Sequence, residues 1–272
     1  MTTDSSAVRQ RFPAQSVIEQ LLYEQGSMPP LSWLARLFGG SPLGVEGVPR
    51  YLGAKGEITV GALLETLPPE WIVFHAIPIA GRNSDIDHLV VGPGGIFTIT
   101  SMCHVGATRH SADVWVGKRI MLVAGRKVSH LRDSECEAER VTHLVRERMP
   151  LLTPVQPVIA LVDPKRLTIA DKPEQVKVID AQDLRRWLVK LHPVLSAGEV
   201  QEVSDLVDSP NTWRPLPLPT ADDDLMERFT ALDAQVRSAG IRRLLWVLVG
   251  AATAIGVSIV VLHALEASQI VG

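Results

Sequence analysis

The chain has 272 residues, 46% of them hydrophobic and 5% aromatic, so it can bury the core of one domain of ordinary size with accessory segments, or of two small domains. Its formal net charge of −3 argues against binding nucleic acid mainly through a general basic surface, although a local basic patch stays open. Two cysteines without paired Cys or Cys/His spacing argue against a disulfide framework and structural zinc, and are typical of a reducing compartment.

Residues 1–52 contain two short predicted helices. The segment QSVIEQLLYEQ has aliphatic residues on one helical face, and LSWLARLF follows after a break at residues 28–30. We expect the second helix either to pack on the main domain or to lie on a membrane surface, where only Arg36 would offer a cationic anchor. Its apolar side chains are Leu31, Trp33, Leu34, Leu37 and Phe38.

Residues 53–208 alternate between helical and strand patterns. GEITVGALLETL predicts a helix with Glu57 in its first turn, WIVFHAIPI a strand, and IDHLVV with IFTIT a hairpin around residues 92–95. DVWVGKRIMLVAGRKV predicts further strands and SECEAERVTHLVRERM a helix. PVIALVD and VKVID then predict strands, and AQDLRRWLVKL predicts a helix. This order is typical of an α/β domain.

The C-terminal part of the chain predicts a membrane anchor. Residues 209–219 hold four prolines and are expected to form a stiff, extended linker. Residues 220–240 predict a juxtamembrane helix whose apolar stripe either pairs two chains or packs on the domain. Residues 241–265 include 22 consecutive residues without a formal charge, which as a helix rising about 1.5 Å per residue match the ~30 Å core of a bilayer. A short tail, residues 266–272, follows. The stripe consists of Leu225, Phe229, Leu232 and Val236.

The charges flanking this span predict its orientation. Arg237, Arg242 and Arg243 precede the span, and the tail after it has no basic side chain. By the positive-inside rule we expect a tail-anchored, single-pass protein of the cell membrane with its N-terminal bulk in the cytoplasm. Small residues in the span would let a second helix approach, so a homodimer through the span or the juxtamembrane helix is one expected partnership. They are spaced four apart, Gly250 with Ala254 and Ala252 with Gly256.

The predicted hairpin brings two acids opposite two uncharged side chains. If residues 92–95 form the turn, Asp87 lies opposite Thr100 and Asp85 lies opposite Met102. All four side chains share one face of the sheet, because side chains alternate along a strand.

The hairpin and its flanks together match a known pattern. The matching parts are Gly56 and Glu57 on a helix, the run 86–91, the turn 92–95, the strand 96–99, Gly106, the helix near 134–148 and the strand 157–162. Over about residues 53–165 the chain resembles the nuclease-related domain family, NERD, a branch of the PD-(D/E)xK restriction-endonuclease-like superfamily. The resemblance implies a mixed sheet flanked by helices, to which this chain adds one C-terminal transmembrane helix.

The resemblance also implies the composition of a metal site. Active members hold a divalent metal with a first-strand aspartate and a second-strand glutamate, assisted by a helix glutamate and by a lysine two positions after the second acid. Asp87 and Glu57 match the first-strand and helix acids, whereas Thr100 and Met102 stand in place of the second acid and the lysine. A neutral hydroxyl and a thioether cannot supply the missing charges, so we expect metal affinity and hydrolysis to be lost. Glu57 and Asp87 are then either remnants of a metal site or ordinary surface acids.

The alternative is that other residues have replaced the missing groups. Asp85 lies on the correct face and is the main candidate for a migrated ligand. His88 points to the opposite face, and neighbours on one strand cannot easily bind the same ion. The further candidates are His75, His88, Cys103, His104 and Lys118.

A locally basic region is predicted around the helix near 134–148. Acidic residues interleave with it, so we expect a solvated charged surface rather than a nucleic-acid site. The basic residues are Arg140, Arg146, Arg148, Lys118, Arg119, Arg126 and Lys127, and the acidic ones are Glu135, Glu137, Glu139 and Glu147.

Two functional hypotheses follow from these patterns. The first is a pseudoenzyme without a cofactor, acting as a binding or scaffolding module at the cytoplasmic membrane face, with an unidentified protein or nucleic acid as partner. The second is a membrane-tethered, Mg²⁺-dependent nuclease that uses Asp87, Glu57 and the migrated Asp85. Convergence of these three acids with a lysine would favour the enzyme.

Overall fold

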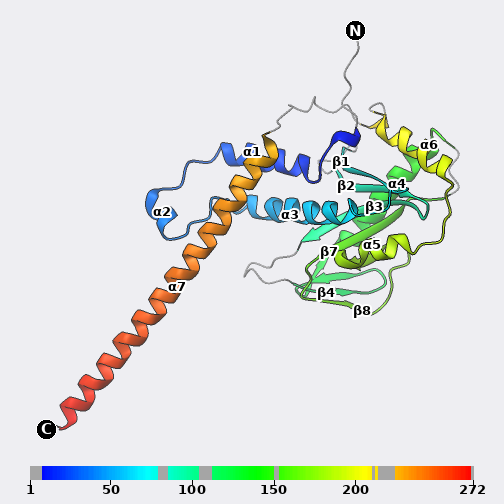
Figure 1. Cartoon of the computed structure of the whole chain (residues 1–272). Coiled ribbons are helices and arrows are strands. Elements are labelled where there is room, and N and C mark those ends of the chain that lie inside the picture. Colours follow the sequence, from blue (N-terminus) through cyan, green and yellow to red (C-terminus); the bar gives the residue numbers. More distant parts are fainter. Residues whose placement is uncertain are drawn as a thin grey trace. The chain divides into compact units, whose positions relative to one another are not determined.

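The computed structural model (Figure 1) describes residues 8–78, 85–103, 112–149, 153–209, 212–213 and 224–270, the last nine by their backbone alone. Two compact units form by mutual contacts, Met1–Gln20 with Pro49–Asp222 and Leu21–Val48 with Asp223–Gly272. We call the first the α/β unit and the second the anchor unit. The N-terminal segment of residues 1–52 is divided between them.

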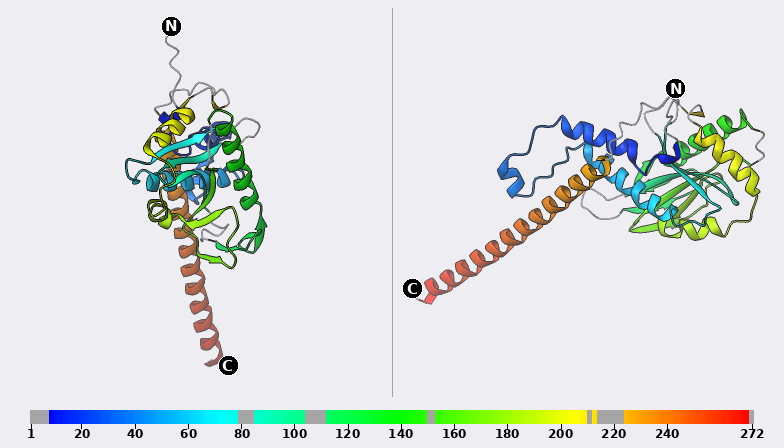
Figure 2. Two further views of the ribbon diagram at one scale, coloured as in Figure 1. Left: turned by 90° about the vertical axis from the view of Figure 1, so that its right-hand side faces the viewer. Right: turned by 45° about the horizontal axis from the view of Figure 1, so that its top comes forward.

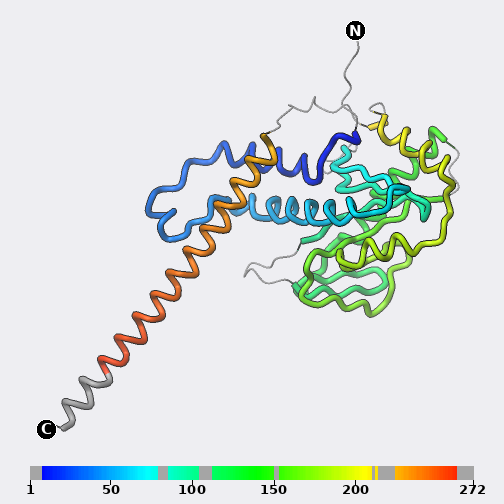
Figure 3. The backbone as a smooth tube through the Cα atoms, in the orientation of Figure 1, coloured from blue at the N-terminus to red at the C-terminus, as the bar shows by residue number. Residues whose placement is uncertain are grey.

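The α/β unit is built around a five-stranded mixed sheet in the order β1-β2-β3-β7-β9. The first three strands pair antiparallel, whereas β3, β7 and β9 pair parallel. Figure 3 traces the backbone in the same orientation as Figure 1. The parallel pairs arise because the chain returns through crossovers rather than hairpins. The strands are β1 Ile72–Ile77, β2 Ile86–Gly92, β3 Gly95–Cys103, β7 Gln156–Val162 and β9 Lys177–Asp180.

A second, four-stranded sheet has the order β6-β5-β4-β8. The strands expected within residues 113–128 form three of its members, and the fourth pairs parallel with β4. The fourth strand was not predicted, because it is only four residues long and mostly exposed. The members are β4 Asp113–Val116, β5 Met121–Val123, β6 Arg126–Val128 and β8 Arg166–Ile169.

Helices cover both faces of the main sheet (Figures 1 and 2). One face packs on α3 (Gly47–Leu64) and α5 (Ala181–Val189), and the other packs on α4 (His130–Arg146) and α6 (Ala197–Asp208). The α4 face also meets the second sheet, where Met102 joins Val114 and Leu131 in a common apolar cluster. The predicted α/β class, with a mixed sheet flanked by helices, is confirmed.

Helix α3 begins earlier than its sequence pattern predicts. It starts at Gly47 rather than near Gly56, so Glu57 lies in the middle of the helix and the predicted first-turn position is wrong. Pro49 fits the first helical turn, where its missing N–H costs nothing, and the glycines that follow weaken the helical pattern without breaking it.

The register of the hairpin agrees with the sequence prediction. Gly92 pairs with Gly95 and His88 pairs with Ile99, so the strands continue to Asp87 beside Thr100. The glycine turn is required because the ring of Trp71 lies against it. A Cβ on Gly92 would stand 2.3 Å from Trp71 Cε3.

The anchor unit contains α2 (Trp33–Leu37), most of α1 (Gln15–Gly26), and α7 (Leu225–Ile270). The juxtamembrane and transmembrane helices expected from the sequence form one continuous helix. Over Leu225–Val261 this helix is long and apolar enough to cross a membrane. Near its start Leu225, Phe229 and Leu232 are buried within the chain.

Several expectations fall outside the described residues. They concern Gly106, His104, most of the linker 209–219, the start of the helix expected over 220–240, and the side chains of the tail 266–272.

Candidate functional site

Asp87 lies near the start of β2, at the edge of the face covered by α4. Its Oδ2 accepts the backbone N–H of Ser101 at 2.7 Å. The side chain is half-buried. Burial is the main cause that raises its pKa to about 7, the charge of Asp85 adds to the rise, and the N–H of Ser101 opposes it.

Glu57 reaches the same place from the middle of α3 and is 6% exposed. Gly56 lets the helix come close to the end of β3, since a Cβ there would stand 3.1 Å from the Cβ of Cys103. Burial raises the pKa of Glu57 well above its ordinary value, and the charges of Asp87 and Asp85 raise it further. The backbone N–H of Ala14 donates to this carboxylate and opposes the rise.

Ala14 adopts a left-handed backbone with φ of 65° and is fully buried. This conformation costs about 1 kcal/mol or more for a residue other than glycine. Its N–H thereby reaches Glu57, and so the segment before α1 takes part in holding a carboxylate.

Glu137 on α4 is the third member of the acidic cluster. Its Oε1 is buried and has no hydrogen-bond partner among the described residues. Burial, followed by the charge of Asp87, raises its pKa to about 8. Glu137 also contributes to the raised pKa of Glu57. The three carboxyl groups therefore come from α3, β2 and α4 and influence one another electrostatically.

Asp85 stands beside this cluster and adds its charge to it. The Arg11 guanidinium lies 3.8 Å from Asp85 Oδ2 and donates to Ser16, with its side chain 9% exposed. Burial lowers the pKa of Arg11, while the charges of Asp85 and Glu19 raise it. The arginine is thus a cation close to the acids, contributed by the N-terminal segment.

Thr100 and Met102, the two uncharged residues of the hairpin, each contact residues outside the acidic cluster. Thr100 Oγ1 lies 3.1 Å from Ser134 Oγ on α4. Met102 is 7% exposed and packs in the apolar cluster between the two sheets. Neither side chain supplies charge to the acidic cluster.

A buried polar chain runs along the opposite face of the same strands. His75 Nδ1 lies 2.8 Å from His88 Nδ1, and His88 Nε2 lies 3.0 Å from Ser101 Oγ. Burial lowers the pKa of His75 to about 4, and burial together with His75 lowers that of His88. Both rings are therefore neutral near pH 7. The two Nδ1 atoms share one proton. If His75 carries it, His88 Nε2–H donates to Ser101, and if His88 carries it, the Ser101 hydroxyl donates to His88 Nε2.

This chain ends at the residue that orients Asp87. The Ser101 side chain bonds to His88, and the Ser101 N–H bonds to Asp87. The histidines considered as metal ligands thus support the backbone behind the cluster.

Other candidates from the sequence lie elsewhere or remain undescribed. Lys118 pairs with Glu174 at the surface, at 2.6 Å. Cys103 is half-buried at the end of β3 beside Gly56, and His104 lies outside the described residues. Among the described residues, no three His, Cys, Asp or Glu side chains stand close enough to one point to hold an ion together.

Glu137 is the member of the cluster that its charged neighbours in the sequence predict to lie on the solvated surface. One signal in the sequence could have identified it. Glu137 lies three residues after Ser134 and four before Val141, and both of these are buried on the inner side of α4.

Residues 52–162 match the family model of the nuclease-related domain. Over these residues, about two fifths of the chain, the protein is similar to the NERD family. The match runs from α3 to the end of β7 and includes Glu57, Asp87 and Glu137, which confirms the resemblance noted from the sequence. No curated protein and no solved structure matches the chain.

Proposed function

We propose that the NERD domain is a membrane-tethered, divalent-cation-dependent nuclease in which Glu137 supplies the acid that the second strand lacks. The observation that carries this proposal is the buried Oε1 of Glu137, which lies near Asp87 and has no hydrogen-bond partner in the described part of the chain. Buried carboxylates close to one another are costly unless a cation neutralises them. Their presence together in this domain is best explained by a ligand of opposite charge.

The donor set suits a hard cation such as Mg²⁺, which prefers oxygen ligands and usually needs only one or two protein carboxylates. Asp87 with either Glu137 or Glu57 meets that requirement, and substrate phosphate and water would complete the coordination. A bound cation would act as a Lewis acid and lower the pKa of water.

The side chains of this cluster have separable roles. Asp87 is fixed by the Ser101 N–H, so it would serve as the central ligand. Glu57 is held by the Ala14 N–H, and Glu137 has an oxygen without a partner among the described residues. Each would flank Asp87 as a second ligand or as a proton acceptor. Arg11 would offset negative charge near Asp85.

The decisive test compares two glutamates of α4. The full chain in detergent would be titrated with Mg²⁺ and Mn²⁺ and assayed for cleavage of DNA and RNA, together with Glu137→Gln, Asp87→Asn and the exposed control Glu139→Gln. We expect both site variants to lose cleavage by roughly a hundredfold or more, since each removes a charged ligand, and the control to keep it. Equal activity of Glu137→Gln and Glu139→Gln would contradict the proposal.

A second candidate function is supported by Met102. This residue takes the position where the family pattern has lysine, and it is buried among apolar side chains rather than facing the acids. The domain would then bind a cation and nucleic acid, or a protein, without hydrolysis. Cation binding that Glu137→Gln abolishes, without cleavage by the unmodified chain, would favour this binding module.

We also propose that α7 anchors the domain in the cell membrane with the N-terminal bulk in the cytoplasm. The length and apolar surface of the helix support anchoring, and Arg237, Arg242 and Arg243 before the uncharged stretch support the orientation. The substrate or partner would accordingly be encountered at the inner membrane face.

A further inference from the structure

We propose that α2 is a second membrane-contacting element, lying in the interface between lipid headgroups and acyl chains beside the entry point of α7. This inference rests on the membrane anchoring proposed above. It adds a lipid-binding face that a transmembrane anchor alone does not require.

The first observation is the exposed apolar surface of α2. Trp33 is 71% exposed and Phe38, directly after the helix, is 53% exposed, and no residue of α2 is buried. Leu34 and Leu37 are also exposed, and their spacing sets them on one side of the short helix together with Trp33 and Phe38. Such a cluster marks an interaction surface rather than a surface adapted to water.

The second observation is that this segment is fixed to the start of the uncharged part of α7. Trp246 Nε1 donates to the carbonyl of Leu37 at 3.0 Å, and its ring lies 4.9 Å from that of Phe38. Arg243 donates to the carbonyl of Gly39 at 3.0 Å. Gly39 itself packs against the helix backbone, since a Cβ there would stand 2.5 Å from the carbonyl oxygen of Ala239.

These contacts set the depth of α2 relative to the bilayer. Arg243 is the last charged residue before the uncharged stretch, and Trp246 lies about 4.5 Å further along the helix axis. The headgroup region is roughly 5–7 Å thick on each side of the hydrocarbon core. Leu37 and Phe38 therefore lie at the interface, the depth at which tryptophan side chains and amphipathic helices are enriched.

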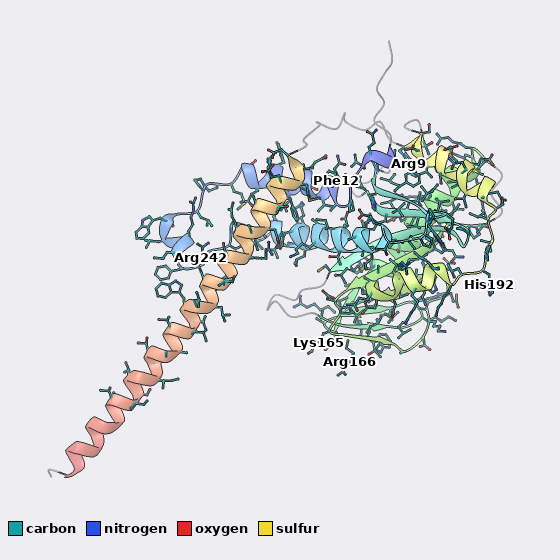
Figure 4. All side chains as sticks on the ribbon, viewed as in Figure 1. Arg9, Phe12, Lys165, Arg166, His192 and Arg242 are labelled. Atoms are coloured by element: carbon teal, nitrogen blue, oxygen red, sulfur yellow. The ribbon has the colours of Figure 1, made fainter. Side chains whose placement is uncertain are left out.

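Lipid fits this surface better than a protein partner does. The apolar side of α2 adjoins the exposed apolar surface of α7, where Leu244, Leu245 and Val247 face outward. Arg36 and Arg242 line a groove of about 570 Å³ on the headgroup side, and Arg242 is labelled on α7 in Figure 4. Cations above an apolar face are the arrangement that suits phospholipid headgroups.

The test uses the native tryptophans of the full chain. The protein would be reconstituted into liposomes with and without brominated lipids, and its tryptophan fluorescence would be measured. The fluorescence of each indole is the difference between the unmodified chain and Trp33→Phe, Trp246→Phe or Trp115→Phe. Trp115 is 38% exposed in the α/β unit and is the reference for an indole in contact with water. Aqueous iodide quenching would be measured on the same samples.

We expect brominated lipid to quench the Trp33 contribution about as strongly as that of Trp246, and iodide to quench it less than that of Trp115. The inference is overturned if iodide quenches the Trp33 fluorescence and brominated lipid does not, while brominated lipid quenches Trp246. In that case the proposed anchoring by α7 still stands. If neither Trp33 nor Trp246 is quenched by brominated lipid, the proposed anchor itself fails, and the inference fails with it.

Discussion

Asp87, Glu57 and Glu137 are acids in a setting that favours their neutral forms. Burial raises the pKa of each, to about 7 for Asp87 and about 8 for Glu137. A divalent cation would reverse this preference, because it stabilises the charged carboxylates. If it binds a cation as proposed, the cluster links proton binding, cation binding and folding.

This link predicts how stability depends on pH without divalent cations. Below about pH 4 these acids are protonated in both folded and unfolded chains, so they contribute no difference. Between about pH 4 and 8 the unfolded chain releases its protons first, and the folded state loses stability as pH rises. In EDTA we expect the unfolding free energy to fall by several kcal/mol over this range, and Tm to fall with it.

Asp87→Asn should flatten this pH dependence, because the amide cannot ionise and its oxygen can still accept the Ser101 N–H. Glu65→Gln, an exposed change directly after the helix that bears Glu57, should keep the original dependence. A Tm that rises between pH 5 and 8 in EDTA would refute the assigned burial of these acids. Thermal unfolding followed by circular dichroism measures Tm at each pH.

The histidine chain behind the cluster predicts a stability effect of another kind. His88→Leu removes the partner of both His75 Nδ1 and Ser101 Oγ, and each buried polar group left unpaired costs about 1–3 kcal/mol. We expect a loss of roughly 2–5 kcal/mol in urea unfolding. The exposed control His192→Leu, labelled in Figure 4, should change stability by less than about 0.5 kcal/mol.

Sequence patterns predicted some of these residues and not others. The position of Asp87 opposite Thr100 follows from side-chain alternation and a short turn, both of which are local. The burial of Glu137 depends on which side of α4 meets the sheet. Because Glu135 and Glu139 are also glutamates, the sequence does not indicate which of the three faces the sheet. The pairing of His75 with His88 depends on the register across residues 78–85, which no local pattern fixes.

At the scale of elements, glycines let α3 approach two other segments: Gly56 faces the end of β3, and Gly61 faces Pro13. A Cβ on Gly61 would stand 2.3 Å from Pro13 Cγ, whereas one on Gly53 would meet nothing within 4 Å. The close approach brings the segment containing Arg11 and Ala14 onto the helix that bears Glu57. Helix packing therefore sets the geometry of the acidic cluster.

This contrast between two glycines of one helix predicts opposite effects of the same substitution. Gly61→Ala should destabilise the α/β unit by about 1–3 kcal/mol, because the rigid ring of Pro13 leaves no room. Gly53→Ala should stabilise it by about 0.5–1 kcal/mol through helix propensity alone. Urea unfolding of the two variants measures the difference, and a stabilising Gly61→Ala would contradict the packing described.

The elements themselves were largely predictable because their periodicities are strong. The start of α3 was not, since the glycines within residues 47–56 resemble loop sequence until tertiary packing is known. The contact between α2 and α7 joins residues about two hundred positions apart, and no local pattern encodes such a contact.

At the scale of the molecule, the proposed anchor can be removed without touching the α/β unit. A chain lacking residues 241–272 should enter the soluble fraction after alkaline extraction of membranes, whereas the full chain should stay with the lipid. Fractionation followed by immunoblotting measures this partition. Retention of the shortened chain in the pellet would show that α7 is not the main anchor.

The contact of residues 37–39 with α7 gives the proposed membrane helix two unequal sides. At 3.6 residues per turn, Gly250 and Ala254 lie below Arg243 and Trp246, on the side that α2 occupies. A neighbouring helix that approached through this pair would collide with α2 near the bilayer surface. Ala252 and Gly256 lie on the opposite side, so lateral assembly of two spans is unobstructed in one direction only.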